Sequence, residues 1–328
     1  MAVFLTSTAT GASILTPYNV IVSGSFNDSS DIGGGLAVEG FATLGTGALG
    51  GGLDGEPLGA FVDNTTLIAA GGASAGIMSN AGSENWYIYG TDSTFQHGND
   101  KGGTSDSSDP ITFTGTGGAF TQPSNQSNAW AAMTANTGTD ACTASGSTTT
   151  CTVNATGLNI VNVQDSTIAS GQTLLITTGS GMSWGTSWVV INVTGSAVDP
   201  YGTAANPLTL SGSMEIGEDG TNYLGNNGDG SPIGAEDVVF NFNTAQHITM
   251  GGSSMGSVLA PDAAVTGCTY GCQFVGSLVA ASFTQGADSG TEFHNFIFMG
   301  GATPEPVPLA CVGAGLIALA LVRKRRRG

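Results

Sequence analysis

Short apolar runs that each end at a glycine place the strongest constraint on the fold of this chain. Four of them stand between residues 19 and 90, with the sequences NVIVSG, GLAVEG, TLIAAGG and WYIYG. Each is rich in strand-forming residues and too short for a helix, which is typical of β-strands. Glycine, asparagine, aspartate and serine separate the runs, so the pattern predicts many strands joined by tight turns.

A repeat later in the chain narrows the fold class further. The sequence GSVLAP begins at Gly256 and GSLVAA begins at Gly276, 20 residues later. A period near 20 with one short strand per unit is typical of a solenoid, in which stacked coils share one core. Glycine is abundant, at 53 of 328 residues, and it suits the corners between coils. The sequence therefore predicts an all-β fold, a right-handed β-solenoid over residues 13–300.

One segment, PSNQSNAWAAMTANTG, breaks the β pattern and starts at residue 123. Its alanine-rich content predicts one helix over residues 125–136, with Ser124 as the N-cap and Gly138 as the C-cap. We expect this helix to lie along the solenoid through an apolar face formed by Ala129, Trp130 and Met133.

Four of the five cysteines fall into two close pairs, Cys142 with Cys151 and Cys268 with Cys272. Four cysteines allow three pairings, and the sequence does not choose among them. Local pairing is the simplest arrangement and indicates an oxidising compartment. A zinc site is the alternative, although the chain's histidines are scattered and offer no ligand spacing.

Charge is distributed very unevenly along the chain. There are 24 acidic and six basic residues, and five of the basic ones are Arg323, Lys324, Arg325, Arg326 and Arg327. The acidic body should be repelled by nucleic acid, so we expect no nucleic-acid partner. The basic cluster follows an uncharged apolar run over residues 307–322, which is preceded by Pro304, Glu305 and Pro306. Such a run predicts a short transmembrane helix whose basic end stays in the cytoplasm.

The tail over residues 301–328 resembles the PEP-CTERM sorting signal of Gram-negative bacteria. The resemblance implies that an exosortase recognises the tail, removes it, and releases or attaches the body at the surface, often within an exopolysaccharide matrix. A plain membrane anchor is the alternative. Residues 1–12 form an uncertain leader without a basic segment, so we expect the true start of an exported chain to lie upstream.

The body also resembles a known family, the choice-of-anchor A domain of bacterial surface proteins. The resemblance rests on segments that occur in the family's order, although DIGGG replaces the more usual DVEGR. It implies a β-solenoid-like domain related in shape to ice-binding and adhesive domains, with no catalytic residues. The segments are YNVIVSGSFNDSSDIGGGLAVEG, SWVVINVTG, VVFNFNTAQHITM, GSVLAPDAAV and EFHNFIF.

Two further patterns could bind a ligand. The loop over residues 217–237 is rich in carboxylates, and Asp219, Asp229, Glu236 and Asp237 could ligate Ca²⁺ as a cofactor. A solvated insertion between strands is the alternative interpretation. Alternating threonines in TFTGTGG and STTTCTV are compatible with a flat face that orders water, and equally with ordinary strand surface. The motif GASAG, centred on Ser74, lacks the helix that a catalytic serine needs after it.

These observations lead to one functional hypothesis and two alternatives. We expect an exported, non-enzymatic protein of the cell surface or extracellular matrix that binds exopolysaccharide or a neighbouring surface. Before processing, the apolar helix would hold it in the inner membrane. An ice-binding solenoid is the first alternative. A hydrolase of matrix glycans is the second, and it would need two converging carboxylates.

Overall fold

The computed structural model describes residues 18–45, 65–69, 73–78, 85–88, 94–97 and 120–298. The last range has short gaps at 137–140, 170–171, 196–201, 204–205, 219–220, 224–233, 269–270 and 288–289. The expected leader over 1–12 and the sorting tail over 301–328 lie outside the described residues. Strands dominate and helices are few, which confirms the mostly-β class expected from the sequence.

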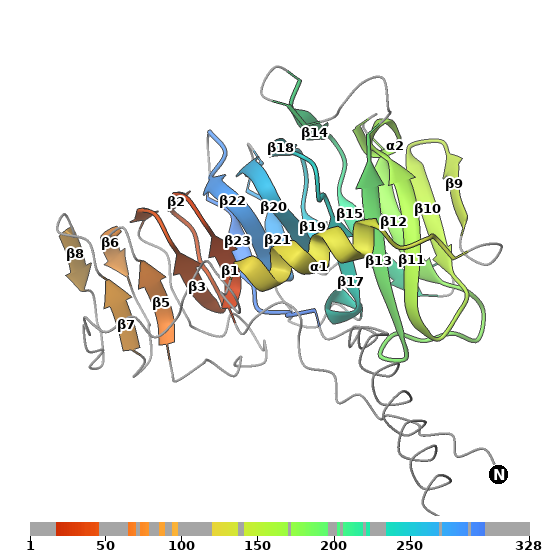
Figure 1. Cartoon of the computed structure of the whole chain (residues 1–328), viewed down its shortest axis with the longest axis horizontal. Helices are drawn as coiled ribbons and strands as arrows, with labels where there is room; N and C mark the ends of the chain where they lie inside the picture. Colours follow the sequence, from red (N-terminus) through yellow and green to blue (C-terminus); the bar gives the residue numbers. More distant parts are fainter. Residues whose placement is uncertain are drawn as a thin grey trace, which may run out of the picture.

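The first ladder of parallel strands runs the length of the molecule (Figure 1). Every neighbouring pair in it is parallel. Its strands, in spatial order, are β11 (Gly157–Gln164), β13 (Ser187–Thr194), β17 (Val238–Asn241), β20 (Ser257–Thr266), β22 (Leu278–Thr284), β1 (Tyr18–Val22), β3 (Gly35–Val38), β5 (Thr65–Ala69) and β7 (Asn85–Ile88).

The second ladder branches from the first because β20 and β22 change register along their length. The shift falls between Ala260 and Ala264 of β20, so the later part of each strand pairs with a different set of neighbours. This ladder is also parallel throughout. Its remaining strands are β14 (Leu208–Leu210), β18 (His247–Met250), β2 (Phe26–Asp28), β4 (Ala42–Leu44), β6 (Ala73–Met78) and β8 (Thr94–His97), in the order β14-β18-β20-β22-β2-β4-β6-β8.

The third ladder is a separate sheet. Its pairs are parallel except where the β9–β10 hairpin forms one edge and where β16 folds back onto β15. In spatial order its strands are β23 (Glu292–His294), β21 (Gln273–Val275), β19 (Ser254–Met255), β15 (Met214–Glu218), β12 (Thr173–Thr178), β10 (Thr148–Val153) and β9 (Ala141–Ser145), with β16 (Thr221–Tyr223) on β15. A short helix, α2 (Asp165–Ala169), follows β11.

The side chains that point inward from the three ladders form one apolar cluster. At its centre four phenylalanine rings stack or meet edge to face, with centroids 5.0 to 6.2 Å apart. These rings belong to β2, β21, β22 and β23, so they join strands from both ends of the chain. The residues are Phe26, Phe274, Phe283 and Phe293.

The 20-residue repeat expected from the sequence is present as one stacked pair of strands. Val258 of β20 lies beside Leu278 of β22, in the register that the two GS motifs predict. The glycine that begins each motif has a positive φ, 104° at Gly256 and 152° at Gly276. A Cβ atom at Gly276 would lie 2.5 Å from the carbonyl carbon of Gly256, so the close stacking of these corners requires glycine.

The predicted helix exists, but its boundaries differ from the expected 125–136. Helix α1 spans Thr121–Ala131, with Phe120 as its N-cap. Pro123 fits within the first turn, where its missing N–H would have no partner in any case. Ser124 does not cap the helix, because its hydroxyl donates to the carbonyl of Phe120. The helix ends early because Asn136 joins β11, donating its backbone N–H to the carbonyl of Ile160.

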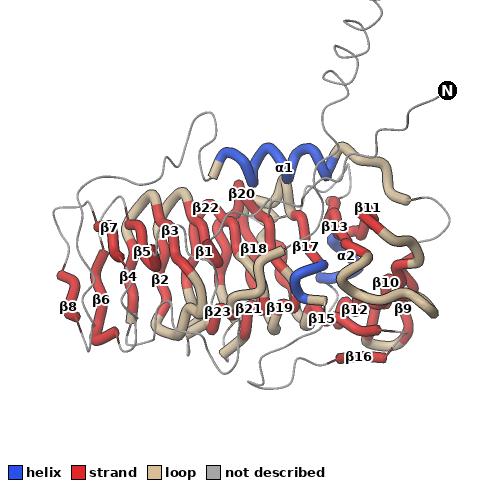
Figure 2. Tube along the Cα trace, turned by 90° about the horizontal axis from the view of Figure 1, so that it is seen from below, coloured by secondary structure: helices blue, strands red, loops and turns tan. Residues whose placement is uncertain are grey.

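Helix α1 covers the outer side of the first ladder (Figures 1 and 2). Trp130 is fully buried there and meets Phe298 edge to face at 5.7 Å. Ala129, expected on the apolar face, is exposed instead, and the buried residues of the helix are Pro123, Gln126, Ser127 and Trp130. The face of α1 toward the sheet therefore carries polar residues, Gln126 and Ser127, as well as Trp130.

A row of asparagines on the first ladder holds the helix in place. Asn162, Asn192 and Asn241 occupy neighbouring positions in the register of β11, β13 and β17. The Asn192 side chain donates to the carbonyl of Trp130 at 2.9 Å. The Asn241 side chain donates to Asn192 at 2.8 Å and to the carbonyl of Ser127 at 2.9 Å, and it accepts from the Ser127 hydroxyl at 2.6 Å.

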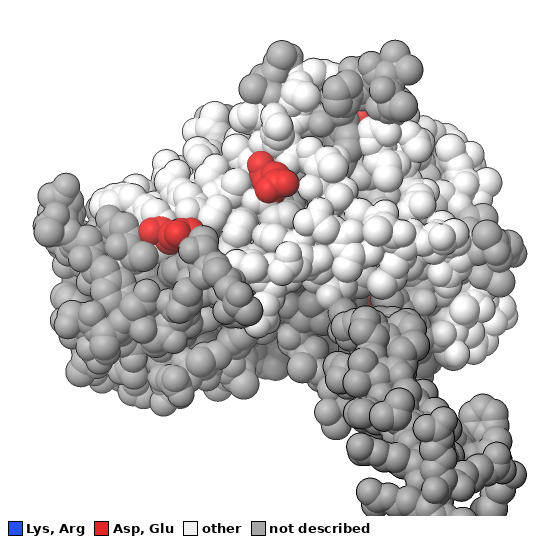
Figure 3. Space-filling model, viewed as in Figure 1, with Lys and Arg blue, Asp and Glu red and all other residues white. Residues whose placement is uncertain are grey.

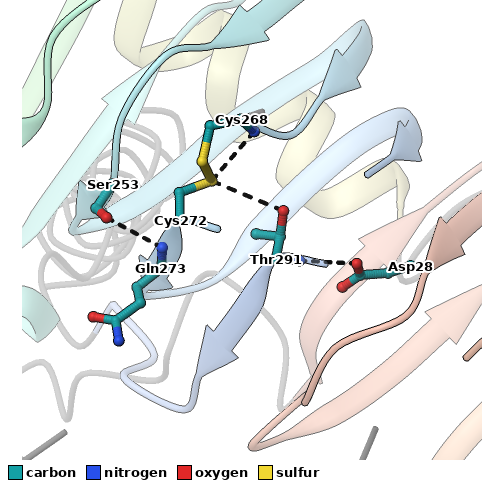
Figure 4. The surroundings of a disulfide bond; sticks show 6 residues. All are labelled: Asp28, Ser253, Cys268, Cys272, Gln273 and Thr291. Atoms are coloured by element: carbon teal, nitrogen blue, oxygen red, sulfur yellow. Dashed lines mark hydrogen bonds between the residues drawn. A yellow bond between two sulfur atoms is a disulfide. The ribbon is translucent and has the colours of Figure 1, made fainter. Parts of the chain in front are cut away.

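The strands do not stack in chain order, because the start of the chain joins its end. β1 and β2 pair with β22, and Ile32 forms a bridge with Phe293. We call this junction of β1 and β2 with β22 and β23 the seam. There the Asp28 carboxylate accepts from the backbone N–H of Thr291 at 2.9 Å, and the Thr291 hydroxyl lies 3.8 Å from the sulfur of Cys272 (Figure 4). Asp28 is 1% exposed.

Candidate functional site

The outer side of the second ladder, which we call the threonine face, is the best candidate for a binding surface. Inward and outward positions alternate along its strands, so one residue in two faces solvent. One outward position recurs in register on six consecutive strands, and five of the six residues are threonine. We call these residues the threonine row: Thr209, Thr249, Thr266, Thr284, Asn27 and Thr43.

The row is regular because its members sit on paired strands. Neighbouring strands lie about 4.8 Å apart, which fixes the spacing between successive residues of the row. Most of these residues are exposed, and Thr249 is partly so. The backbone register continues beyond Thr43 through Ser74 of β6 to Thr94 of β8. Over the six strands of the row, the result is a regular array made mostly of hydroxyl and methyl groups.

A second outward row lies two residues earlier along the same segments of the chain, and on β2 and β4 this position falls just before the strand. His247 pairs with Ala264, and Ala264 pairs with Ser282. Ser25 and Phe41 continue this row, because the carbonyl of Ser25 accepts from Phe283 and the carbonyl of Phe41 accepts from Phe26, each at 3.0 Å. Three small side chains therefore lie between the imidazole of His247 and the phenyl ring of Phe41. We call these residues the second row: His247, Ala264, Ser282, Ser25 and Phe41.

Both rows lack carboxylates and amines, although the chain as a whole is strongly acidic. Asp28 follows Asn27 on β2, but its side chain is buried. The nearest acidic residues with solvent exposure are Asp262, in the bend of β20, and Glu39, two residues before Phe41. No lysine or arginine occurs among the residues that the structure describes. Figure 3 shows that the described surface on the α1 side is also mainly uncharged, with isolated acidic groups. Such a surface suits an uncharged partner.

The cysteines are joined within each close pair. Cys142 is bonded to Cys151, its direct partner in the β9–β10 hairpin, and Cys268 is bonded to Cys272. The second disulfide is buried next to the seam, where the backbone N–H of Cys268 donates to the sulfur of Cys272 at 3.3 Å (Figure 4). Both bonds fix turns of the structure. Cys268 follows Thr266 of the threonine row by two residues, but its side chain is buried.

The proposed calcium ligands are only partly visible. Asp219 and Asp229 lie outside the described residues. Glu236 and Asp237 form part of a short 3-10 helix, η2 (Ala235–Asp237). Asp237 is used structurally, because its carboxylate accepts from the backbone N–H of Gly185 at 2.7 Å. Among the described residues no three histidine, cysteine or acidic side chains lie close enough to hold a metal ion.

Burial, with a smaller contribution from the charge of the adjacent Glu236, raises the pKa of Asp237 to about 6. Hydrogen bonds from the Gly185 backbone and the Trp188 side chain act in the opposite direction and lower it. Burial also raises the pKa of Glu236. Burial thus disfavours the charged form of both carboxyl groups, and N–H donors partly offset this effect at Asp237.

The remaining motifs either lie in ordinary strands or fall outside the described residues. Ser74 lies inside β6 and pairs with Thr43 and Thr94, so it is not at a strand–turn–helix elbow. The threonines of STTTCTV lie on β10 in the third ladder, while TFTGTGG lies outside the described residues. The sorting residues Pro304, Glu305, Pro306, Arg323, Lys324, Arg325, Arg326 and Arg327 lie outside them too. No helix within the described part of the chain is long and apolar enough to cross a membrane.

The fold and the site define a class, an all-β protein with an uncharged, regular sheet face and no assembled catalytic centre among its described residues. A family profile of ice-binding-like adhesive domains matches residues 11–295. The chain therefore belongs to the ice-binding-like adhesive domain family.

Similar proteins were found among solved structures. An ice-binding protein from the Antarctic ascomycete Antarctomyces psychrotrophicus shares 12% identity, with 88% of this chain and 97% of that chain covered, at a TM-score of 0.34. An ice-binding protein from an Antarctic biological consortium also shares 12% identity, with 89% and 96% covered, at a TM-score of 0.33. No curated protein matches the chain at a significant level.

Proposed function

We propose that this protein is an exported adhesive domain of the cell surface or extracellular matrix, and that it binds an uncharged, repetitive surface through the threonine face. The observation that carries this proposal is the in-register row of exposed, uncharged side chains on six strands. Many weak contacts of equal spacing can add up to firm attachment, because a repeating partner engages them together. The family of ice-binding-like adhesive domains supports the same function.

In this proposal the three ladders are the faces of one right-handed β-solenoid. The bends of β20 and β22, which pass from the first ladder to the second, support this architecture. So does the single apolar cluster that the three ladders share. A stack of coils is a stiff rod, so it holds a face flat over a length that a loop could not.

A charge placed in the middle of the row tests the function. The variant Thr284→Lys puts an ammonium group between Asn27 and Thr266, where an uncharged partner would have to desolvate it. We expect retention of the full-length protein on exopolysaccharide from its host to fall about tenfold. Thr150→Lys, on an outward position of β10, is the matched control and should leave retention unchanged. Equal retention of both variants would refute the threonine face as the contact surface.

Ice binding is the second candidate, and the regular spacing of the threonine row favours it. Methyl and hydroxyl groups at fixed intervals of about 4.8 Å can order water into a lattice-like layer. The test is thermal hysteresis of the full-length protein, with Thr266→Lys as the variant that should abolish it. A wild-type protein without thermal hysteresis would exclude this candidate. A glycan hydrolase is less well supported, because both outward rows of the described threonine face lack the carboxylates that such an enzyme needs.

Export and sorting form the second part of the proposal. The order of PEP tripeptide, apolar run and basic cluster supports processing by an exosortase, with the choice-of-anchor A domain as the exported body. Mass spectrometry of the C-terminal peptide, on protein fractionated from its host, tests this directly. We expect the last peptide of the surface or matrix form to end near Pro304, Glu305 and Pro306. An intact arginine tail in a membrane fraction would instead indicate a plain anchor.

A further inference from the structure

One end of the molecule is formed by the strands that terminate the first and third ladders. Figures 1 and 2 place β9, β10 and β11 together at this end. Among the described strands, β11 pairs with β13 alone, and β10 pairs with β12 on one side and with β9 on the other. Strands β10 and β11 each turn one edge away from the rest of their ladder. Such an edge carries backbone N–H and C=O groups that can pair with another chain.

The sequence of this end offers no electrostatic protection against such pairing. Proteins commonly protect an edge strand with lysine, another charged side chain or proline. No charged residue and no proline occurs from Ala141 to Gln164, a range that includes β9, β10 and β11 entirely. β10, with the sequence TTTCTV, consists mostly of β-branched residues. Its length and its lack of charge are typical of segments that pair with copies of themselves.

The chain that follows α1 covers the edge of β11 through Asn136. The backbone N–H of Asn136 donates to the carbonyl of Ile160 at 3.0 Å, and its side-chain oxygen accepts from the N–H of Ile160 at 3.3 Å. Its side-chain amide also donates to the Oδ1 of Asn159 at 3.3 Å. Asn136 thus occupies the two backbone groups that Ile160 turns toward the edge, as a neighbouring strand would.

The next strand along the chain, β9, covers the edge of β10. It pairs antiparallel with β10 over five positions, from Ser145 opposite Thr148 to Ala141 opposite Thr152. Among the described strands β9 pairs with β10 alone, and its residues 142–145 are exposed. A short exposed strand that is held by one neighbour is only marginally stable by itself.

Both ends of β9 are fixed to β10. At one end a two-residue turn, Gly146 and Ser147, joins the strands, and Gly146 has the positive φ of 59° that such a turn favours. At the other end a disulfide joins Cys142 to Cys151, which lies directly opposite in the register. Cys151 is fully buried in the apolar cluster, so this bond ties β9 to the core. The covalent bond therefore holds the end of β9 that packing leaves exposed.

We propose that β9 is a cover latched by the Cys142–Cys151 disulfide, and that it keeps the edge of β10 from pairing with a second copy of this chain. The proposal concerns self-association and does not depend on the ligand of the threonine face. A dithiol opens the latch: it gives two electrons and two protons to the disulfide, which becomes two cysteine thiols, and is itself oxidised to a disulfide. β9 is then free to leave β10, and β10 of a second copy takes its place.

Analytical ultracentrifugation of the full-length protein tests the proposal. The variant Cys142→Ser/Cys151→Val lacks the latch and keeps an apolar side chain at the core position. We expect its weight-average mass to be about twice that of the oxidised wild type at the same concentration, and to rise with concentration. Adding Thr150→Lys puts a charge at an outward position of β10 and should restore the wild-type mass. Asn128→Lys, the matched control, adds the same charge at an exposed position of α1 and should not restore it.

Each outcome decides for or against the cover. The proposal is overturned if the double cysteine variant keeps the mass of the wild type, or if Thr150→Lys leaves the variant associated. Equal rescue by Asn128→Lys would also overturn it, because added charge at any position would then suffice. Should the double variant fail to fold, folded wild type treated with a dithiol gives the decision, once alkylation shows that Cys142 and Cys151 are free thiols. An unchanged mass of that reduced protein would overturn the proposal.

Discussion

Asp28 places a carboxyl group inside the molecule at the seam between the two ends of the chain. Burial raises its pKa from the ordinary value of 3.8 to about 6, although the backbone N–H groups of Thr291, Ser29 and Ser30 act in the opposite direction. The negative charge of Asp31 adds a small increase. The native protein therefore binds a proton more tightly at this site than the unfolded chain does.

This difference predicts how stability changes with pH. Between about pH 4 and pH 6 the native state holds a proton on Asp28 that the unfolded state has released, so the free energy of unfolding falls as the pH rises. The loss from this one group is at most about 3 kcal/mol. Asp237, with a pKa also raised to about 6, acts in the same direction.

The variant Asp28→Asn isolates the contribution of the seam. Its amide oxygen can still accept from Thr291 and Ser29, but the group no longer titrates. We expect urea unfolding between pH 4 and pH 7 to show about half the wild-type pH dependence, with the remainder due to Asp237. A variant with the full wild-type pH dependence would show that Asp28 is not the group that titrates.

At the residue scale the sequence predicts local features well and distant ones poorly. The pairing of Cys142 with Cys151 was the simplest choice because the two residues stand nine positions apart, on either side of a turn. No pattern in the sequence around Asp28 predicts that its side chain is buried. Its burial depends on β22 and β23, more than 250 residues away, and no local pattern reports such a contact. The same holds for Asp237, whose partner Gly185 is 52 positions distant.

At the scale of elements, α1 depends on the asparagine row as much as on Trp130. Asn241→Ala would remove the side chain that bonds both Ser127 and Asn192, and it would leave buried polar groups without partners. We expect a loss of about 3 kcal/mol in the free energy of unfolding and faster hydrogen exchange in α1.

Asn128→Ala is the matched control for this prediction. Asn128 is exposed and bonds only within the helix, to the carbonyl of Ser124 among the contacts that the structure describes. Its replacement should change stability by less than about 0.5 kcal/mol. Similar effects of the two substitutions on hydrogen exchange would mean that the asparagine row does not hold the helix.

Four strands could be predicted individually from the sequence, whereas the order in which the strands pair could not. The four glycine-ended runs correspond to β1, β3, β5 and β7, because short β-rich runs between turn residues form strands wherever they are placed. The intervals between stacked partners vary widely: Val258 and Leu278 are 20 positions apart, but Val190 and Val239 are 49 apart. Because the loops at the corners differ in length, the sequence does not repeat at a constant interval. No repeat in the sequence predicts the pairing of β1 with β22.

At the scale of the whole molecule, the threonine face arises from segments that are unrelated in the sequence. Thr43 and Thr209 lie at opposite ends of the threonine row and come from distant parts of the chain. The sequence showed threonine alternation elsewhere, in STTTCTV, where it marks an ordinary strand of the third ladder. A functional row across strands is visible only when the register is known, because each strand contributes one residue to it.

The most direct test of the account is hydroxyl-radical footprinting of the full-length protein, with and without exopolysaccharide from its host. Phe41 and His247 report on the threonine face, and Trp188 and Met133 report on the side covered by α1; all four are partly exposed. The account predicts that the polymer protects Phe41 and His247 from oxidation and leaves Trp188 and Met133 unchanged. Protection of Trp188 and Met133 instead, or equal protection of all four, would contradict it.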